Sequence, residues 1–366
     1  MSRINVSELS HASNGGDPNI ELHADGSTSI RNLQNQYPKS LIINGDMSVA
    51  QRATSVADID NAGFYTVDRI RHSSSNLGTA RFTVSQEADG PANFSYCYRL
   101  ETTTAQAAGT NTGLRLQYIF EGNDLKNLNW GTADARPLTV SFWVNTSVQG
   151  AYSLNLYRDE ATARNIGTAF TVAAGEINNW KFVTHTFPGD QTTPVTLDAS
   201  QRLTLSISMA EGSDFTTQDN TSWGNYTAPR YAFGQTAQLH ATVNSTFRIT
   251  GLQVTATDEP LEFQHESLSE TLSKCQRYYQ VVRGGIRNDY RSDSSASFGG
   301  PLNFFATCRV TPTATVVNTV SSQNVSSQRI DDISPEGATM QAAGIQSTGG
   351  IAGQLWIADI ALDAEL

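Results

Sequence analysis

The chain has 366 residues, a formal net charge of −11 and only 16% charged residues. This length allows two or three domains with separate cores and excludes a single small domain. The acidic balance argues against a nucleic-acid partner, because neutralising phosphates requires clustered Lys and Arg. Thr, Ser, Asn, Gln and Gly replace many charged residues, which is typical of an extracellular or virion β-protein.

The three cysteines, Cys97, Cys275 and Cys308, are odd in number and lie far apart. We predict buried thiols, with a Cys275–Cys308 disulfide as the alternative. No stretch approaches the roughly 18 apolar residues of a membrane span, and residues 1–16 lack the apolar segment of a signal peptide. We therefore expect no membrane insertion.

Residues 1–38 are polar and aperiodic, and turn signals flank the brief apolar pieces "IEL" and "TSI". This composition predicts an extended arm that needs a partner to become ordered.

From residue 39 to 264 the dominant pattern is alternation of apolar and polar residues, as in "LTVSFWVN" (138–145) and "LTLSISM" (203–209). Gly, Asn, Asp and Pro turns separate these segments without helical periodicity between them. The pattern predicts an antiparallel jelly-roll β-sandwich, rather than a parallel α/β sheet. The apolar parity changes at Gly251, which predicts a β-bulge there.

A helical pattern interrupts the strands at residues 265–283. Four residues at spacings of four, three and four share one helical stripe: Leu268, Leu272, Cys275 and Tyr279. "SLSE" (267–270) matches a capping box, so we predict a junction helix of roughly three to four turns. Arg277 and Tyr278 are expected to point away from the buried stripe.

Residues 284–366 predict a small second β-domain, because "NFFATCRV", "TATVVNTV" and "QLWIADIAL" are typical of strands. Turn signals at "RGG", "FGGP", "SPEG" and "STGG" divide them. A small β-domain with polar faces often gains its core by oligomerising.

Five sequence pieces occur in order between residues 41 and 280. They are "LIINGDMSVAQR" (41–52), "YTVDRIR" (65–71), "NLNWGTADARPLTVSFWV" (127–144), "ITGLQV" with "PLEFQH" (249–265) and "LSKCQRYYQ" (272–280). As an ordered set they resemble phage tail fibre and receptor-binding proteins that carry a carbohydrate-binding-module-like jelly roll. Residues 281–366 share this resemblance only at their beginning.

The resemblance implies a homotrimeric fibre in the virion, with host recognition and adsorption as its function. Residues 1–38 would attach to a phage tail or baseplate protein, and residues 284–366 would form the receptor-binding tip. The implied partner is a host surface glycan or lipopolysaccharide. A glycan-depolymerising tailspike enzyme and a purely structural tail or baseplate protein are the alternatives.

Sugar rings stack on aromatic side chains, and their hydroxyls bind planar amides, carboxylates and guanidinium groups. The turn-rich segment 219–231 supplies such groups at Trp223, Tyr226, Arg230 and Tyr231. These four are candidate glycan-binding residues, and the alternative is a loop pinned to the sandwich by its aromatic side chains.

A second candidate pair, Tyr290 and Arg291, lies in "RNDYRSDS" (287–294), for which a solvated loop is the alternative. Trp130 and Trp143 are expected to have packing roles, and Trp356 to lie in the core or at a trimer interface, rather than to bind a ligand.

The resemblance also suggests a structural calcium at Asn44 and Asp46, although "NGD" is equally a simple turn and calcium needs about six oxygen ligands. No other cofactor is expected. The histidines show no metal-ligand spacing and no nucleophile elbow is present, so we expect no enzyme. Glu259 and Glu262 resemble a catalytic pair, but we predict a structural or exposed role. A glycosidase whose carboxylates converge only in the fold stays open.

Overall fold

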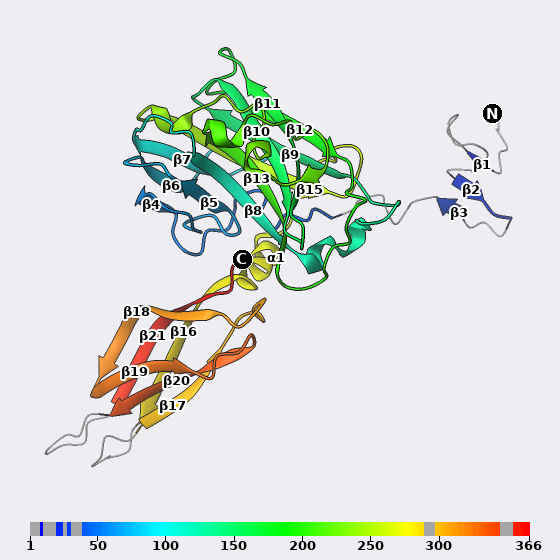
Figure 1. The fold of residues 1–366 in the computed structure, drawn as a ribbon. Helices are drawn as coiled ribbons and strands as arrows, with labels where there is room; N and C mark the ends of the chain where they lie inside the picture. Colours follow the sequence, from blue (N-terminus) through cyan, green and yellow to red (C-terminus); the bar gives the residue numbers. More distant parts are fainter. Residues whose placement is uncertain (1–7, 10–19, 25–27, 31–38, 289–296, 345–353) are drawn as a thin grey trace, which may run out of the picture. The chain divides into compact units, whose positions relative to one another are not determined.

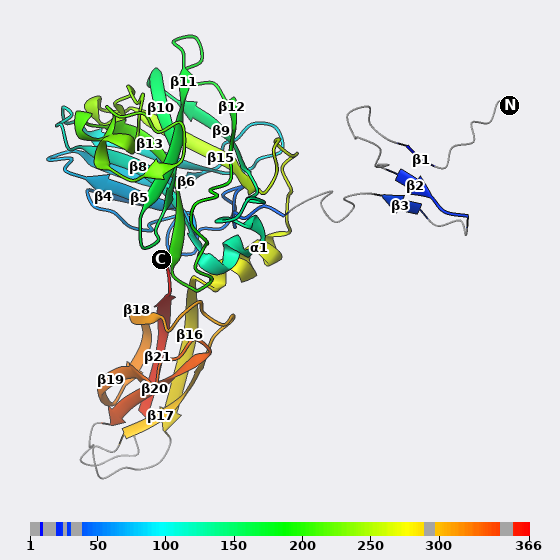
Figure 2. The same ribbon diagram turned by 45° about the vertical axis from the view of Figure 1, so that its right-hand side comes forward.

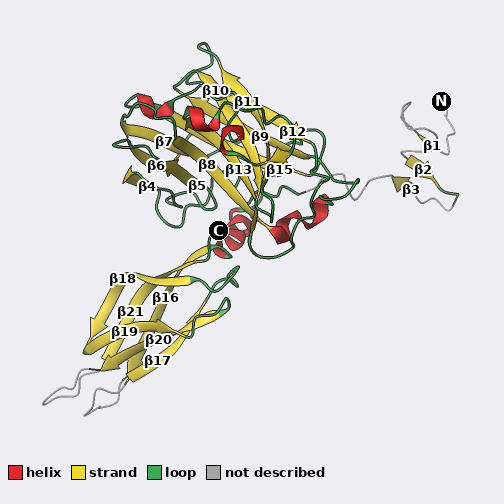
Figure 3. Ribbon diagram, in the orientation of Figure 1, coloured by secondary structure: helices red, strands yellow, loops and turns green. Residues whose placement is uncertain are grey.

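The structure is a computed structural model that describes residues 8–9, 20–24, 28–30, 39–288, 297–344 and 354–366. It comprises two compact units, Met1–Lys39 and Ser40–Leu366. Strands dominate the described residues (Figures 1 and 3), which confirms the all-β prediction. None of the described helices is long and apolar enough to span a membrane.

The first unit contains three short strands, β1 (Glu8–Leu9), β2 (Ile20–Leu22) and β3 (Thr28–Ile30), which pair in the order β1-β2-β3. The apolar pieces "IEL" and "TSI" are β2 and β3, and Ile20 pairs with Ile30. The segment predicted as an extended arm therefore pairs with itself where its apolar residues recur.

Two six-stranded antiparallel sheets form the sandwich of the second unit. The first has the order β14-β11-β10-β13-β8-β5 and the second the order β12-β9-β15-β7-β6-β4. The first sheet comprises β5 (Arg71–Ser75), β8 (Gly113–Glu121), β10 (Gly150–Arg158), β11 (Arg164–Val172), β13 (Gln201–Glu211) and β14 (Gly224–Asn225). The second comprises β4 (Ser55–Ile59), β6 (Arg81–Glu87), β7 (Cys97–Thr104), β9 (Leu138–Thr146), β12 (Lys181–Phe187) and β15 (Thr246–Thr255). Short 3-10 helices span Gly122–Leu128, Ser213–Phe215, Ala228–Arg230 and Leu239–Ala241.

The alternating strands supply the core as predicted. The apolar residues of β9 and β13 are fully buried, and they belong to one continuous cluster shared by both sheets: Leu138, Val140, Phe142, Leu203, Leu205, Ile207 and Met209. Because successive side chains of a strand point to opposite faces, the polar residues between them lie on the outer faces.

The predicted bulge at Gly251 is confirmed. The pairing of β15 with β9 shifts register between Thr250 and Gln253, and Gly251 has φ +62°. A Cβ atom there would approach Phe94 Cζ to 2.8 Å, so both the conformation and the packing favour glycine.

The junction helix α1 is shorter than predicted and spans Leu268–Gln276. Its capping box is confirmed, because Ser267 Oγ accepts a hydrogen bond from the Glu270 backbone N–H. The predicted stripe is wrong at Leu268, which is 61% exposed, while Thr271, Cys275 and Tyr278 are buried. Tyr278 was expected to point away; it is buried because it follows the helix end and packs against the sandwich.

All three cysteines are buried free thiols, so the Cys275–Cys308 disulfide is absent. Burial raises the pKa of the Cys275 thiol well above its ordinary value, so the group is inert at neutral pH.

Two three-stranded sheets, β16-β21-β18 and β17-β20-β19, form the C-terminal β-domain. Their strands are β16 (Tyr279–Asn288), β17 (Ser297–Asn303), β18 (Thr313–Gln323), β19 (Val325–Asp331), β20 (Gly337–Gly344) and β21 (Gln354–Asp363). Trp356, Met340 and Ile360 are fully buried in the core between them.

Three local predictions in this domain are wrong. "NFFATCRV" is not a strand beyond Asn303, because the Phe305 N–H donates to Gln280 Oε1 and the Ala306 carbonyl accepts from Gln280 Nε2. "RGG" lies inside β16, where a Cβ on Gly284 would collide with Met340. "FGGP" lies inside β17, an edge strand that tolerates proline. "STGG" lies outside the described residues.

Candidate functional site

The candidate site lies on the outer face of the first sheet, where β10, β13, β8 and β5 are consecutive neighbours (Figures 1 and 2). Alternation points Leu114, Leu116 and Tyr118 of β8 into the core and leaves Arg115 and Gln117 on the outer face. The same rule places Thr204 of β13, Tyr157 of β10 and Arg71 of β5 on this face.

Part of this polar face is covered by the segment that follows β13, residues 212–240. The Ser153 N–H donates to Gln235 Oε1 at 2.7 Å, and Asn165 Nδ2 donates to the Arg230 carbonyl at 2.8 Å. These bonds satisfy buried polar groups that would otherwise cost free energy. The uncovered part of the face is a groove.

The groove has a cavity volume of about 230 Å³. Its lining combines strands β5, β8 and β13 with one aromatic side chain of β10 and two of the covering segment. The lining residues are Arg71, Arg115, Gln117, Ile119, Tyr157, Gln201, Thr204, Tyr226 and Tyr231.

Tyrosines form one side of the groove. The rings of Tyr157 and Tyr226 meet edge to face, with centroids 5.0 Å apart and planes at 89°. Burial raises the pKa of both phenols, so both stay protonated at neutral pH. Neither hydroxyl bonds to another group in the described part of the chain. The pair therefore offers aromatic surface and two free hydroxyl groups to a ligand.

Tyr231 has a different role, because it is only 6% exposed. Its hydroxyl lies 2.8 Å from Ser206 Oγ and accepts a hydrogen bond from Gln117 Nε2 at 3.2 Å. Its ring lies under the guanidinium of Arg115, with Cζ 4.1 Å from the ring centroid. Tyr231 thus holds Gln117 and Arg115 in position beneath the groove.

Arg115 is also held by Glu211, whose Oε2 accepts from Arg115 Nη2 at 2.8 Å. Burial opposes the charge of Arg115, but Tyr231 and Glu211 outweigh it and raise its pKa. Arg71 donates from Nη1 to Gln117 Oε1 at 2.6 Å. The groove therefore presents guanidinium, amide and phenol groups on a rigid sheet.

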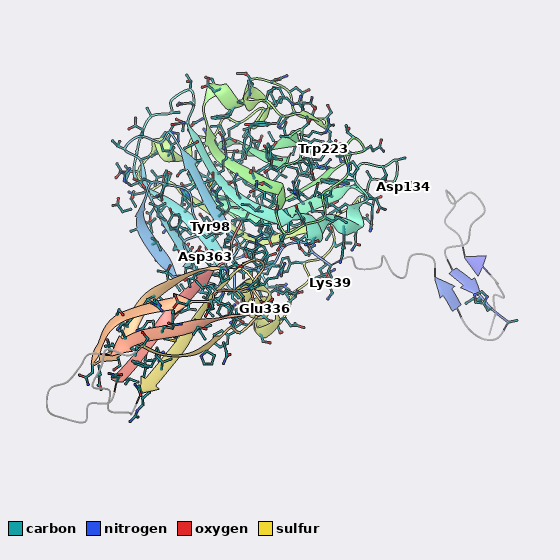
Figure 4. The ribbon with its side chains drawn as sticks, turned by 60° about the horizontal axis from the view of Figure 1, so that its bottom comes forward. Lys39, Tyr98, Asp134, Trp223, Glu336 and Asp363 are labelled. Atoms are coloured by element: carbon teal, nitrogen blue, oxygen red, sulfur yellow. The ribbon has the colours of Figure 1, made fainter. Side chains whose placement is uncertain are left out.

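Tyr226 and Tyr231, two of the four candidates in segment 219–231, line the groove, and the other two do not. Trp223, labelled in Figure 4, lies against Trp130, and its Nε1 donates to the Pro188 carbonyl at 2.7 Å. Arg230 donates to the carbonyls of Asp219 and Ser222, so its guanidinium holds its own loop together. Tyr290 and Arg291 lie outside the described residues.

Sequence reasoning missed Arg71, Arg115, Gln117 and Tyr157 because they occupy the polar positions of alternating strands. Such positions normally face solvent, and only the fold shows that the covering segment turns part of this face into a groove. One signal in the sequence could have indicated these residues. Arg115 and Gln117 occupy consecutive outward positions of "GLRLQYIF" (113–120), and Tyr157 occupies an outward position of "YSLNLYRD" (152–159).

The suggested calcium ligands form a turn. Asn44 donates its amide hydrogens to the carbonyls of Val49 and Asp68, while its Oδ1 accepts from the Val49 N–H at 2.9 Å. Asp46 Oδ1 accepts from Ser48 Oγ at 2.9 Å. Asn44 is therefore engaged within the protein, and the geometry favours the turn.

Among the described residues, Glu87, Asp89 and Cys97 lie close enough together to share a metal ion. Glu87 is instead bound by Arg248, whose Nε lies 2.6 Å from its Oε2. Burial and the two nearby carboxylates raise the pKa of Cys97 to about 12, so a thiolate ligand is disfavoured. This cluster is best described as an ion-pair network.

The other predicted packing roles are confirmed. Trp130 and Trp356 are buried, and Trp143 packs against Phe182 with ring centroids 5.2 Å apart. Glu259 and Glu262 are exposed, as expected.

No protein-family model matches the sequence, and no curated protein matches it. Solved structures that match part of this chain include the enzymatically active domain of bacteriophage CBA120 tailspike protein 4, with a TM-score of 0.31 and 9% identity. That similarity covers 59% of this chain and 21% of the tailspike chain. The family 11 carbohydrate-binding module of a Clostridium thermocellum cellulase has a TM-score of 0.28 and 12% identity over 57% of this chain and 99% of the module.

A family 30 carbohydrate-binding module is also similar, with a TM-score of 0.28 and 11% identity over 62% of this chain and 97% of the module. The assignment of this chain as a β-sandwich rests on its own two six-stranded sheets.

Proposed function

We propose that this protein binds a cell-surface saccharide in the groove on the outer face of the first sheet. The observation that carries the proposal is the pairing of Tyr157 and Tyr226 beside Arg71, Arg115 and Gln117. Aromatic rings contact the apolar C–H faces of a sugar, while phenol, amide and guanidinium groups bind its hydroxyls. Arg71, Arg115, Gln117 and Tyr157 stand on strands, so little ordering of these groups is needed on binding.

Binding without cleavage is part of the proposal. The described lining residues of the groove include no Asp or Glu. Glycosidases use two carboxyl groups, one as acid and one as base or nucleophile. Glu211, which binds the lining residue Arg115, is 3% exposed, which supports a structural role for it.

The biological role that fits this activity is attachment of a phage tail fibre to its host. The support is the ordered set of sequence pieces between residues 41 and 280 that resembles such proteins. In this role the segment 1–38 joins the fibre to the tail, and several weak glycan sites act together. A site of millimolar affinity contributes about 4 kcal/mol, and simultaneous engagement of three sites multiplies the avidity.

Assembly as a homotrimer is supported by strand β18. It is an edge strand of the sheet β16-β21-β18, and residues 313–323 contain no charged side chain. Val316, Val317 and Val320 are 40%, 54% and 45% exposed. Proteins commonly protect an edge strand with charges, proline or a covering segment, so this edge suits contact with another copy of the chain.

The test is binding of the labelled full-length protein to an array of bacterial surface polysaccharides. Tyr226→Ala should weaken binding about tenfold, because it removes a central aromatic contact. The matched control is Tyr96→Ala, which removes an exposed tyrosine outside the groove and should leave binding unchanged. Equal binding by wild type and Tyr226→Ala would contradict the site.

The same polysaccharides distinguish glycan binding from the two alternatives, a depolymerising enzyme and a structural tail component. Release of shortened saccharides would establish a depolymerising enzyme instead. Failure of the protein to bind either the array or susceptible cells would favour a purely structural tail component.

A further inference from the structure

Arg71 differs in its partners from three other arginines of the sandwich. Arg115 pairs with Glu211, Arg158 with Asp190 and Arg69 with Glu365. Arg71 forms one hydrogen bond, from Nη1 to the neutral amide of Gln117, and within the described residues it pairs with no carboxylate.

The guanidinium of Arg71 is nevertheless partly removed from water. Burial lowers the pKa of Arg71 from its ordinary value. Desolvating a cation without a counter-ion costs free energy, and proteins normally pair such a group. A ligand that brings a negative charge would supply the missing partner.

The charges around the groove also favour a negatively charged ligand. Its lining contains two arginines and no carboxylate. Glu211 neutralises Arg115 from behind and is fully engaged, since its Oε1 also accepts from Ser208 Oγ at 2.8 Å. One positive charge is therefore left in the groove of a chain whose formal net charge is −11.

The geometry of Arg71 suits one kind of anion. Its Nη1 is directed to Gln117, which leaves the Nε and Nη2 hydrogens for a ligand. Two parallel N–H donors match the two oxygens of a carboxylate. The Tyr157 and Tyr226 rings and hydroxyls line the same cavity, so a sugar ring and its acidic substituent can be bound together.

We infer that the ligand of the groove is an acidic saccharide, a sugar carrying a carboxylate such as a uronic acid, and that Arg71 binds the carboxylate. The inference rests on the proposed function and narrows its ligand class. Arg71 is thereby a specificity-determining residue, and the tyrosines supply contacts that neutral and acidic sugars share.

The test compares each acidic polysaccharide with its carboxyl-reduced form, in which every carboxylate has become a primary alcohol. The probes are oligosaccharides of hyaluronate, polygalacturonate, alginate and polysialic acid, each titrated calorimetrically into the full-length protein. We expect at least one acidic form to bind about tenfold or more tightly than its reduced counterpart, which is the usual effect of a charge-assisted bidentate contact.

Arg71→Gln should reduce this ratio to about one, whereas Arg283→Gln should not change it. The control removes the same charge from an exposed position in the C-terminal domain. The comparison of acidic and reduced ligands uses the wild-type protein, so it decides the inference even if Arg71→Gln fails to fold.

The results distinguish failure of the acidic-saccharide inference from failure of the proposed glycan-binding function. Equal affinity for acidic and reduced forms, or binding restricted to neutral dextran, mannan or xyloglucan, overturns the inference and leaves glycan binding intact. Failure to bind all of these acidic and neutral probes overturns the proposed function together with the inference.

Discussion

The guanidinium of Arg69 lies on the ring of Tyr278, with Cζ 3.6 Å from the ring centroid. Both side chains are buried, and Arg69 also donates to the Ile119 carbonyl and pairs with Glu365. The hydroxyl of Tyr278 in turn donates to the buried carboxylate of Glu121 at 2.6 Å. These contacts hold the end of the junction helix and the last residues of the chain against the sandwich.

Other contacts complete this junction. Arg52 pairs with Asp363 at the end of β21 (Figure 4), and Gln51 Nε2 donates to the Tyr279 carbonyl at 2.7 Å. The pieces 41–52, 65–71 and 272–280, which resemble the fibre family, thus meet in space. Contacts at this junction are therefore a structural role that the three pieces share.

Replacing Arg69 should destabilise the protein strongly. Arg69→Met leaves Glu365, whose side chain is 5% exposed, with only its longer pair to Arg52 Nη1 at 3.6 Å. We expect a loss of about 3–5 kcal/mol in the free energy of unfolding, measured by urea denaturation. Arg329→Met is the control, because it breaks an exposed pair with Asp331 and should cost less than about 1 kcal/mol. Similar losses for both variants would show that the buried pair is not essential.

Gly251 should resist substitution. Gly251→Ala places a Cβ 2.8 Å from Phe94 Cζ at a residue with φ +62°, so we expect a loss of about 1–3 kcal/mol by the same denaturation. Gly175→Ala is the matched control, since no atom lies within 4 Å of its added Cβ. The bulge is dispensable if the two variants unfold at the same urea concentration.

The stability of the sandwich should depend on pH through His72. Burial, with a smaller effect of Arg71, lowers the pKa of His72 from 6.5 to about 4. The folded state therefore binds fewer protons than the unfolded chain between these values. Stability from this residue is complete above about pH 6.5 and falls by about 3 kcal/mol as the pH drops to about 4.

His72→Phe keeps an aromatic ring beside Phe82 and removes the titrating group. The difference in unfolding free energy between wild type and variant should change by this amount across pH 6.5 to 4 and stay constant above that range. Parallel pH profiles would refute the assignment to His72.

Self-association should depend on β18. The intact chain is expected to have a trimeric mass by light scattering, and Val317→Asp with Val320→Asp should shift it to a monomer by placing charges on the exposed edge. Leu197→Asp adds a charge at an exposed apolar residue elsewhere and should leave the mass unchanged. A monomeric wild-type chain contradicts the trimer.

The alternation of apolar and polar residues predicted the sandwich, because the inward positions of β9 and β13 need apolar residues. The bulge was predicted because the apolar positions change from one parity to the other at Gly251. The helical stripe failed at Leu268, the first residue of α1, which is 61% exposed, although Tyr279 beyond the end of the helix is buried as predicted. Gly284 was mistaken for a turn residue, although it makes room for Met340. That contact joins residues distant in the sequence, so local turn signals do not reveal it.

The candidate site was only partly predictable for the same reason. Tyr226 and Tyr231 were found because aromatic residues in a turn-rich segment are unusual. Arg71 and Arg115 were not, since an outward arginine on a strand normally faces water. Their joint position depends on the neighbouring places of β5 and β8 in the sheet.

The most direct test of the central claim is a crystal structure of the full-length protein with a bound oligosaccharide chosen by the polysaccharide titrations. The account predicts a sugar ring against Tyr157 and Tyr226, with its carboxylate on Arg71. A saccharide bound only outside this groove, for example on the C-terminal domain, would contradict it.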